Sequence, residues 1–124
     1  MNGSDLLIDT NIVIYLLGKD DTLSAVLKDQ NVSISFITEI ELLSYLKLTV
    51  ADRRKISNFL DWVTVIQSNP RINQYAVEYR LKGGLKLPDA VIAATARYLG
   101  CSLLTADKRF MTVPNINVIR YERK

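Results

Sequence analysis

Hydrophobic positions along this chain occur in short runs that alternate between strand-like and helix-like spacing. Strands are predicted where a run is short or alternates with polar residues, at 5–8, 32–36, 102–105 and 116–121, with a strand or extended connection at 62–66. Helices are predicted where apolar residues recur every three or four positions, at 10–18, 22–29, 38–48, 52–61, about 69–82 and about 87–99. This alternation predicts an α/β fold in which helices cover both faces of a mostly parallel sheet.

Polar and glycine residues mark the ends of several predicted helices. Thr22 is expected to cap the second helix, and Ser68 or Asn69 the fifth. The pair Gly83-Gly84 and the single Gly100 are expected to end the last two helices, because glycine adopts the backbone conformation common at helix C-termini.

The composition is that of a globular protein that occupies a single domain over residues 1–124. Hydrophobic residues make up 48% of the chain and charged residues 23%, and no apolar run reaches the roughly 18 residues that a membrane span needs. The N-terminal segment carries Asp5 and Asp9 where a signal peptide would have basic and then apolar residues. These features predict a cytoplasmic protein without a membrane partner.

Charge and histidine content limit the possible chemistry. The net charge is +3, and the basic residues are grouped at 53–55, at Arg80 with Lys82 and Lys86, at 108–109, and at Arg120 with Arg123-Lys124. Each group alone fits a solvated surface, and together they are compatible with a polyanionic partner. The absence of histidine excludes histidine-based acid–base catalysis and histidine metal sites, so any catalysis depends on other side chains or on a bound ion.

Four carboxylates stand at junctions between predicted elements, and each has a structural explanation. Asp9 could cap the helix that follows it, and Thr38 with Glu41 matches a capping box. Asp89 lies at a helix start, where the helix dipole favours a negative charge, and Asp107 lies in a turn after a strand.

The combined positions of the four acids point to a metal site. Asp9 and Asp107 follow predicted strands, while Glu41 and Asp89 fall in the first turns of helices at the same edge of a parallel sheet. Clustered carboxylates repel one another and remain ionised mainly when a cation neutralises them. Because every candidate ligand is an oxygen, the expected metal is Mg²⁺ or Mn²⁺ and not Zn²⁺.

Four segments around these acids resemble the PIN-domain nucleases, and within them the VapC-type toxins of toxin–antitoxin pairs. The matching segments are Leu7-Ile8-Asp9-Thr10-Asn11, Ile37-Thr38-Glu39-Ile40-Glu41-Leu42, Leu87 to Ala96, and Leu104-Thr105-Ala106-Asp107-Lys108-Arg109-Phe110. Their order and spacing cover nearly the whole chain, and the chain has the length of a lone toxin domain.

The resemblance implies a PIN-like three-layer α/β/α sandwich with a sheet of about five strands, an acidic metal site and endoribonuclease activity. It also implies a homodimer and a small antitoxin whose tail covers the site. Asp9, Glu41, Asp89 and Asp107 match the four acids of the family pattern. Thr105 matches a hydroxyl position that could orient a water or a phosphate, and Asn11 is expected to support the acids.

The resulting hypothesis is metal-assisted hydrolysis of RNA by water, which leaves a 5′-phosphate and a 3′-hydroxyl. Asp9 and Asp107 are the first choice as metal ligands, Asp89 joins them directly or through water, and Glu41 is a ligand or the general base. The basic residues expected to contact the RNA backbone are Lys86, Lys108 and Arg109.

Two alternatives from other classes are weighed against the nuclease. A receiver-like signalling domain has a similar length and an acidic Mg²⁺ pocket, but the strand predicted at 32–36 is followed by Ile37 and not by a phosphoacceptor aspartate. A PIN-like module without activity, which binds RNA or protein, is disfavoured because all four acids are present.

Overall fold

A five-stranded parallel sheet forms the middle layer of the computed structural model, which describes residues 5–123. Lys124, the end of the last basic group, lies outside the described residues. The strands are β1 (Asp5–Ile8), β2 (Asn31–Ser35), β3 (Thr64–Ile66), β4 (Ser102–Thr105) and β5 (Asn117–Arg120). Their order is β3-β2-β1-β4-β5, and every neighbouring pair is parallel.

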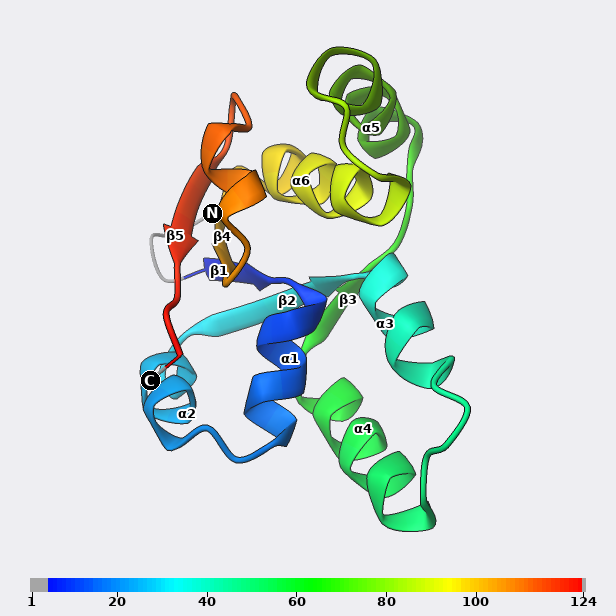
Figure 1. Cartoon of the computed structure of the whole chain (residues 1–124), viewed down its shortest axis with the longest axis vertical. Helices are drawn as coiled ribbons and strands as arrows, with labels where there is room; N and C mark the ends of the chain where they lie inside the picture. The colour runs from blue at the N-terminus through cyan, green and yellow to red at the C-terminus, as the bar shows by residue number, and fades with distance from the viewer. Residues whose placement is uncertain (1–4, 124) are drawn as a thin grey trace.

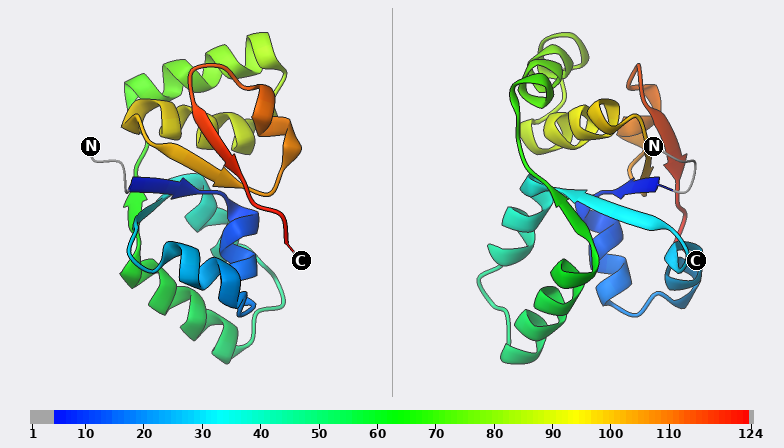
Figure 2. Two further views of the ribbon diagram at one scale, coloured as in Figure 1. Left: turned by 90° about the vertical axis from the view of Figure 1, so that its left-hand side faces the viewer. Right: turned by 180° about the vertical axis from the view of Figure 1, so that it is seen from behind.

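Helices cover both faces of this sheet (Figures 1 and 2). The helical segments are α1 (Thr10–Leu17), α2 (Asp21–Leu27), α3 (Phe36–Leu43), α4 (Val50–Trp62), α5 (Pro70–Gly83), α6 (Leu87–Leu99) and the 3-10 helix η1 (Lys108–Thr112). Helices α1, α2 and α4 pack on one face, and α5 and α6 on the other. The predicted three-layer α/β/α sandwich is thereby confirmed. Among residues 5–123, none of the helices combines the length and the apolar character needed to cross a membrane.

The alternation of side chains along β1 divides the core into two halves. Leu6 and Ile8 pack with the α1, α2 and α4 layer, whereas Leu7 packs with α5 and α6 beside its register partner Leu103 of β4. Burying one such side chain contributes about 1.5–3 kcal/mol. A shift of β1 by one residue would move all three to the wrong face, so the burial pattern fixes where β1 ends and where Asp9 lies.

Helix α6 lies against the sheet because its buried face is built from small residues. Ala90, Ala93, Ala94 and Ala96 are all completely buried. The helix ends as predicted at Gly100, whose φ of 67° lies in the left-handed region that glycine adopts without strain.

Several boundaries differ from the predictions. The cap of α2 is Asp20, whose carboxylate accepts a hydrogen bond from the Leu23 amide at 3.0 Å, and not Thr22. The predicted helix at 38–48 begins earlier, at Phe36, because Ser35 caps it, and it ends at Leu43. The last apolar positions of that prediction fall in the following connection, where the Leu46 side chain is 97% exposed.

Candidate active site

Asp9 lies where β1 ends and α1 begins, and it is 4% exposed. Its Oδ1 accepts a hydrogen bond from the Ile12 amide at 3.0 Å, so the predicted capping role is confirmed, and its Oδ2 accepts one from the Thr105 hydroxyl. Burial raises the pKa of this carboxyl; the two hydrogen bonds oppose that rise, and the neighbouring carboxylates Asp107 and Asp89 add to it. Asp9 is therefore a buried acid whose charge the fold alone does not balance.

Thr105, the last residue of β4, connects Asp9 to Asp107. Its fully buried hydroxyl donates to Asp9 Oδ2 and accepts from the Asp107 amide at 3.0 Å. The sequence analysis assigned this hydroxyl to a water or a phosphate. In the structure its proton is directed at Asp9, so the hydroxyl positions the carboxylate instead.

Glu41 reaches the same edge of the sheet from α3. Its Oε1 accepts a hydrogen bond from the Thr10 hydroxyl at 2.7 Å, and Thr10 Oγ1 lies 3.0 Å from Thr38 Oγ1. Because the Thr10 proton goes to Glu41, Thr38 is the donor to Thr10. The capping box proposed for Thr38 and Glu41 is wrong, since Ser35 caps α3 and both side chains face α1 instead.

Asp89 lies in the first turn of α6, two residues after Leu87. Burial is the largest cause that raises its pKa, and Asp107 and Glu41 raise it further, while Arg109 and Lys86 lower it. These effects on the pKa of Asp89 show that the carboxylates from α3, α6 and the end of β4 interact electrostatically.

Arg109 is the cation of this cluster. Its Nε and Nη2 donate to Asp107 Oδ2 at 2.9 and 2.6 Å, and Nη2 lies 3.4 Å from Asp89 Oδ2. These contacts, above all the hydrogen bonds from Arg109, hold the pKa of Asp107 below its usual value. Arg109 was expected to contact the RNA backbone outside the acidic cavity, whereas in the structure its side chain faces the acids.

All four acids line one cavity of about 150 Å³ at the carboxyl edge of the sheet. Asn11 and Arg109 line it too, together with Thr10 and Tyr45, which the sequence analysis did not single out. In the sequence, Thr10 fits a helix start as well as a site, and Tyr45 belongs to no motif. Lys86 and Lys108 are exposed at the starts of α6 and η1 and, among the described residues, stand outside the cavity lining.

The chemistry of the cavity fits a hard divalent cation. Its charged ligand candidates are carboxylates, and burial leaves Asp9 and Asp89 with raised pKa values that a cation would lower again. Within residues 5–123, no three acidic or cysteine side chains converge closely enough to hold one ion as they stand. Metal binding therefore requires the side chains to move together, and Arg109 stands between two of them.

Comparison with known families identifies the family of this chain. The model of the PIN domain matches residues 6–116. This chain belongs to the PIN-domain family. Its members are nucleases, so the family accounts for an acidic cavity at the edge of the sheet.

Solved structures with the same fold include toxin–antitoxin proteins. The PIN domain described here is similar to a chain of VapBC2 from Rickettsia felis bound to a promoter DNA fragment, with 25% identity, a TM-score of 0.84 and coverage of 95% of this chain and 99% of that chain. It is similar to a toxin–antitoxin complex from Klebsiella pneumoniae, with 28% identity, a TM-score of 0.77 and coverage of 95% and 99%. VapBC-1 from nontypeable Haemophilus influenzae gives 25% identity, a TM-score of 0.80 and coverage of 94% and 97%. Comparison with curated proteins gives no significant match.

Proposed function

We propose that this PIN-domain protein is a metal-dependent endoribonuclease and the toxin of a toxin–antitoxin pair. The observation that carries the proposal is the cavity at the sheet edge, where a buried Asp9 shares one lining with Glu41, Asp89 and Asp107. The family match supports nuclease chemistry, and the similarity to toxin–antitoxin complexes supports the biological role.

The four carboxylates would hold Mg²⁺ or Mn²⁺, with Asp9 and Asp107 as the principal ligands. When bound, such an ion polarises the scissile phosphate and lowers the pKa of an attacking water. Thr105 fixes the orientation of Asp9, and Thr10 fixes that of Glu41. Since Thr10 binds Glu41 Oε1, we assign Oε2 as the oxygen that takes the proton of the attacking water. Asn11 completes the polar wall beside these groups.

Basic residues around the cavity would hold the RNA backbone. Lys86 and Lys108 are exposed next to the acids, and Arg109 would exchange its carboxylate partners for a phosphate when a metal ion neutralises them. Binding through these residues depends on salt and little on base sequence.

Cleavage of single-stranded RNA with and without Mg²⁺ or Mn²⁺ tests the proposal. Metal-dependent products with a 5′-phosphate and a 3′-hydroxyl are expected, and Asp107→Asn should abolish them. Asp61→Asn is the matched control, because Asp61 is an exposed carboxylate on α4. Products that end in 2′,3′-cyclic phosphate would contradict the mechanism, because they require attack by the ribose hydroxyl. RNA binding without cleavage would instead favour a PIN-like module that has no activity.

The toxin role adds a small antitoxin partner and a homodimer to the proposal, in the cytoplasm. Expression of the chain should arrest bacterial growth, and co-expression of a short neighbouring open reading frame should relieve the arrest. Growth arrest by the Asp107→Asn variant equal to that of the unchanged protein would show that toxicity does not depend on cleavage.

A further inference from the structure

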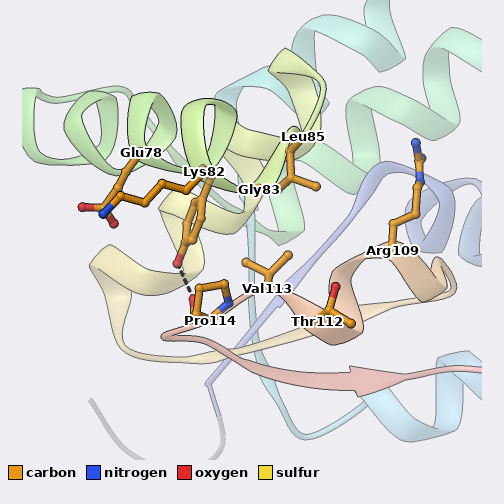
Figure 3. A pocket seen from close by; sticks show the side chains of 9 residues that line it. Glu78, Lys82, Gly83, Leu85, Arg109, Thr112, Val113 and Pro114 are labelled. Atoms are coloured by element: carbon orange, nitrogen blue, oxygen red, sulfur yellow. Dashed lines mark hydrogen bonds between the residues drawn. The ribbon is translucent and has the colours of Figure 1, made fainter.

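A second cavity, of about 210 Å³, lies between the C-terminal end of α5 and the chain that follows η1 (Figure 3). Lys82, Gly83 and Leu85 line it from the side of α5, and Thr112 and Val113 line it from the side of η1. Arg109 lines both this cavity and the carboxylate cavity. The two hollows are therefore neighbours that share one cationic side chain.

The walls of the second cavity are apolar and fixed in place. Leu85 and Val113 face each other across its middle in Figure 3. Beside them, the ring of Tyr79 is 3% exposed, and its hydroxyl donates to the carbonyl of Pro114 at 2.6 Å, which ties α5 to the segment after η1. This hydrogen bond joins the two sides of the cavity.

The rim of the cavity carries charged groups of both signs. Glu78 is the acid of the lining, and it is paired with Arg97 at a distance of 2.5 Å. Figure 3 shows Lys82 on one side of the cavity, with Glu78, and Arg109 on the other side, where its guanidinium is paired with Asp107 and Asp89. A largely apolar hollow beside the carboxylate cavity suits the flat apolar body of a ligand whose backbone reaches that cavity.

We propose that this cavity binds one nucleobase of the RNA, next to the nucleotide whose phosphate enters the carboxylate cavity. The proposal rests on the proposed ribonuclease function and deepens it, because it assigns the residues that select a base. Proteins recognise single-stranded RNA through unstacked bases, which stack on aromatic or arginine side chains and form hydrogen bonds through their edges. Here Arg109 is the planar side chain of the lining. The volume is below the roughly 300–1,000 Å³ of cavities for drug-sized ligands, and it therefore suits a single base.

The path of η1 sets the spacing between the two cavities. Asp107 caps η1, and the five residues of this helix carry the chain about 10 Å from the acids to Thr112. Arg109 lies between the two ends, where the backbone linking two nucleotides would pass. Lys82 and the Thr112 hydroxyl would contact the edge of the base.

Gly83 allows this cavity to be filled without damage to the fold. A Cβ atom added at Gly83 meets nothing within 4 Å, and Gly83 is not among the glycines with a positive φ. Gly83→Trp introduces a bulky side chain at the lining, and Gly83→Ala is the matched control. Thr112→Trp fills the cavity from the opposite wall at an exposed position.

Binding of AMP, GMP, CMP and UMP in metal-free buffer, followed by NMR, tests the proposal directly, with ribose 5-phosphate as the ligand that lacks a base. At least one nucleotide should shift the amide signals of Gly83, Leu85 and Val113, and ribose 5-phosphate should not. Gly83→Trp and Thr112→Trp should weaken this binding about tenfold or more, which corresponds to a loss of about 1.4 kcal/mol of binding free energy. The Gly83→Ala variant should bind as the unchanged protein does. Shifts that are absent from these amides, or that survive both tryptophan variants, would overturn the proposal.

Cleavage of a randomised RNA pool separates this inference from the proposed function. The unchanged protein should prefer a base at one position beside the cut, and Gly83→Trp should flatten that preference while Gly83→Ala preserves it. The same preference in Gly83→Trp would overturn the base cavity and leave the nuclease intact. Nucleotide binding in a protein that cleaves no RNA would retain the cavity and refute the nuclease.

Discussion

Replacement of Asp9 by alanine removes two hydrogen-bond acceptors from the point where β1 meets α1. One carboxylate oxygen caps α1 through the Ile12 amide, and the other accepts the hydroxyl proton of Thr105. Asp9 is 4% exposed and Thr105 is fully buried, so water does not readily replace either partner. The variant therefore leaves a helix start without its cap and a buried hydroxyl without its acceptor.

Two terms set the size of the effect. Loss of a helix cap costs about 1 kcal/mol, and a buried hydroxyl that lacks a partner costs about 1–3 kcal/mol. Removal of a buried charge opposes them, because burial and the neighbouring acids disfavour the ionised form of Asp9. We expect a net loss of about 2 kcal/mol, which lowers the melting temperature of a domain of this size by about 6–10 °C.

Asp9→Asn separates this structural role from the proposed catalytic one. Asparagine caps helices as well as aspartate does, and it removes the buried charge. Because the Nδ2 of asparagine cannot accept the Thr105 hydroxyl proton as Oδ2 does, thermal unfolding in metal-free buffer at neutral pH should show Asp9→Asn near the melting temperature of the unchanged protein, and Asp9→Ala well below it. Neither variant should cleave RNA.

The two assays can contradict the reasoning independently. An Asp9→Ala protein that melts with the unchanged protein would mean that the hydrogen bonds to Ile12 and Thr105 do not stabilise the end of β1. Undiminished cleavage by Asp9→Asn would remove Asp9 from the reaction, whatever its effect on stability.

Three further predictions concern the charge balance of the carboxylate cavity. Without metal, the free energy of unfolding should fall as the pH rises above about 5, because the raised pKa values of Asp9 and Asp89 mean that the folded protein holds their protons more tightly than the unfolded chain does. Asp107, whose pKa is lowered, is ionised in the folded and the unfolded protein over this range. Melting curves with and without Mg²⁺ check this pH dependence, and a melting temperature that does not change with pH would refute it. Arg109→Gln should bind Mn²⁺ more tightly in calorimetry, because the guanidinium no longer occupies two of the acids, and an unchanged affinity would show that Arg109 does not compete. Thr105→Val keeps the side-chain shape and should lower metal affinity or cleavage about 10–100-fold through loss of carboxylate orientation, whereas unaltered values would assign Thr105 to packing alone.

The strands were predictable where burial and turn signals agree. The segments at 5–8 and 102–105 have the predicted bounds, because each is a short apolar run that a polar turn ends. The start of α3 was missed, because Phe36 continues the alternation of β2 and only the hydrogen bond from the Ile37 amide to Ser35 Oγ shows where the helix begins. Hydrophobic periodicity alone does not show whether Ser35 continues the strand or caps the helix.

The position of the acids was predictable, and the partners that hold them were not. Strand ends and helix starts at one edge of a parallel sheet led to the four carboxylates, which line one cavity. The inward turn of Arg109 depends on a contact with Asp107 two residues before it at the start of η1, a spacing that helix periodicity does not bring together. The pair Thr10 and Thr38 joins residues 28 positions apart, and such a contact needs the fold itself.

The structural and chemical roles of these acids are not alternatives, because a carboxylate has two oxygens with separate capacity for hydrogen bonds. Asp9 caps α1 with Oδ1 and meets Thr105 with Oδ2, and Asp107 accepts the amide of Arg109 with Oδ1 at 2.9 Å while its Oδ2 meets the guanidinium. At a helix start, the backbone amides and the helix dipole favour the ionised form, which offsets part of the cost of burial. Placement at these junctions therefore lets the fold keep acids buried and close together, and the remaining repulsion is what a bound cation would relieve.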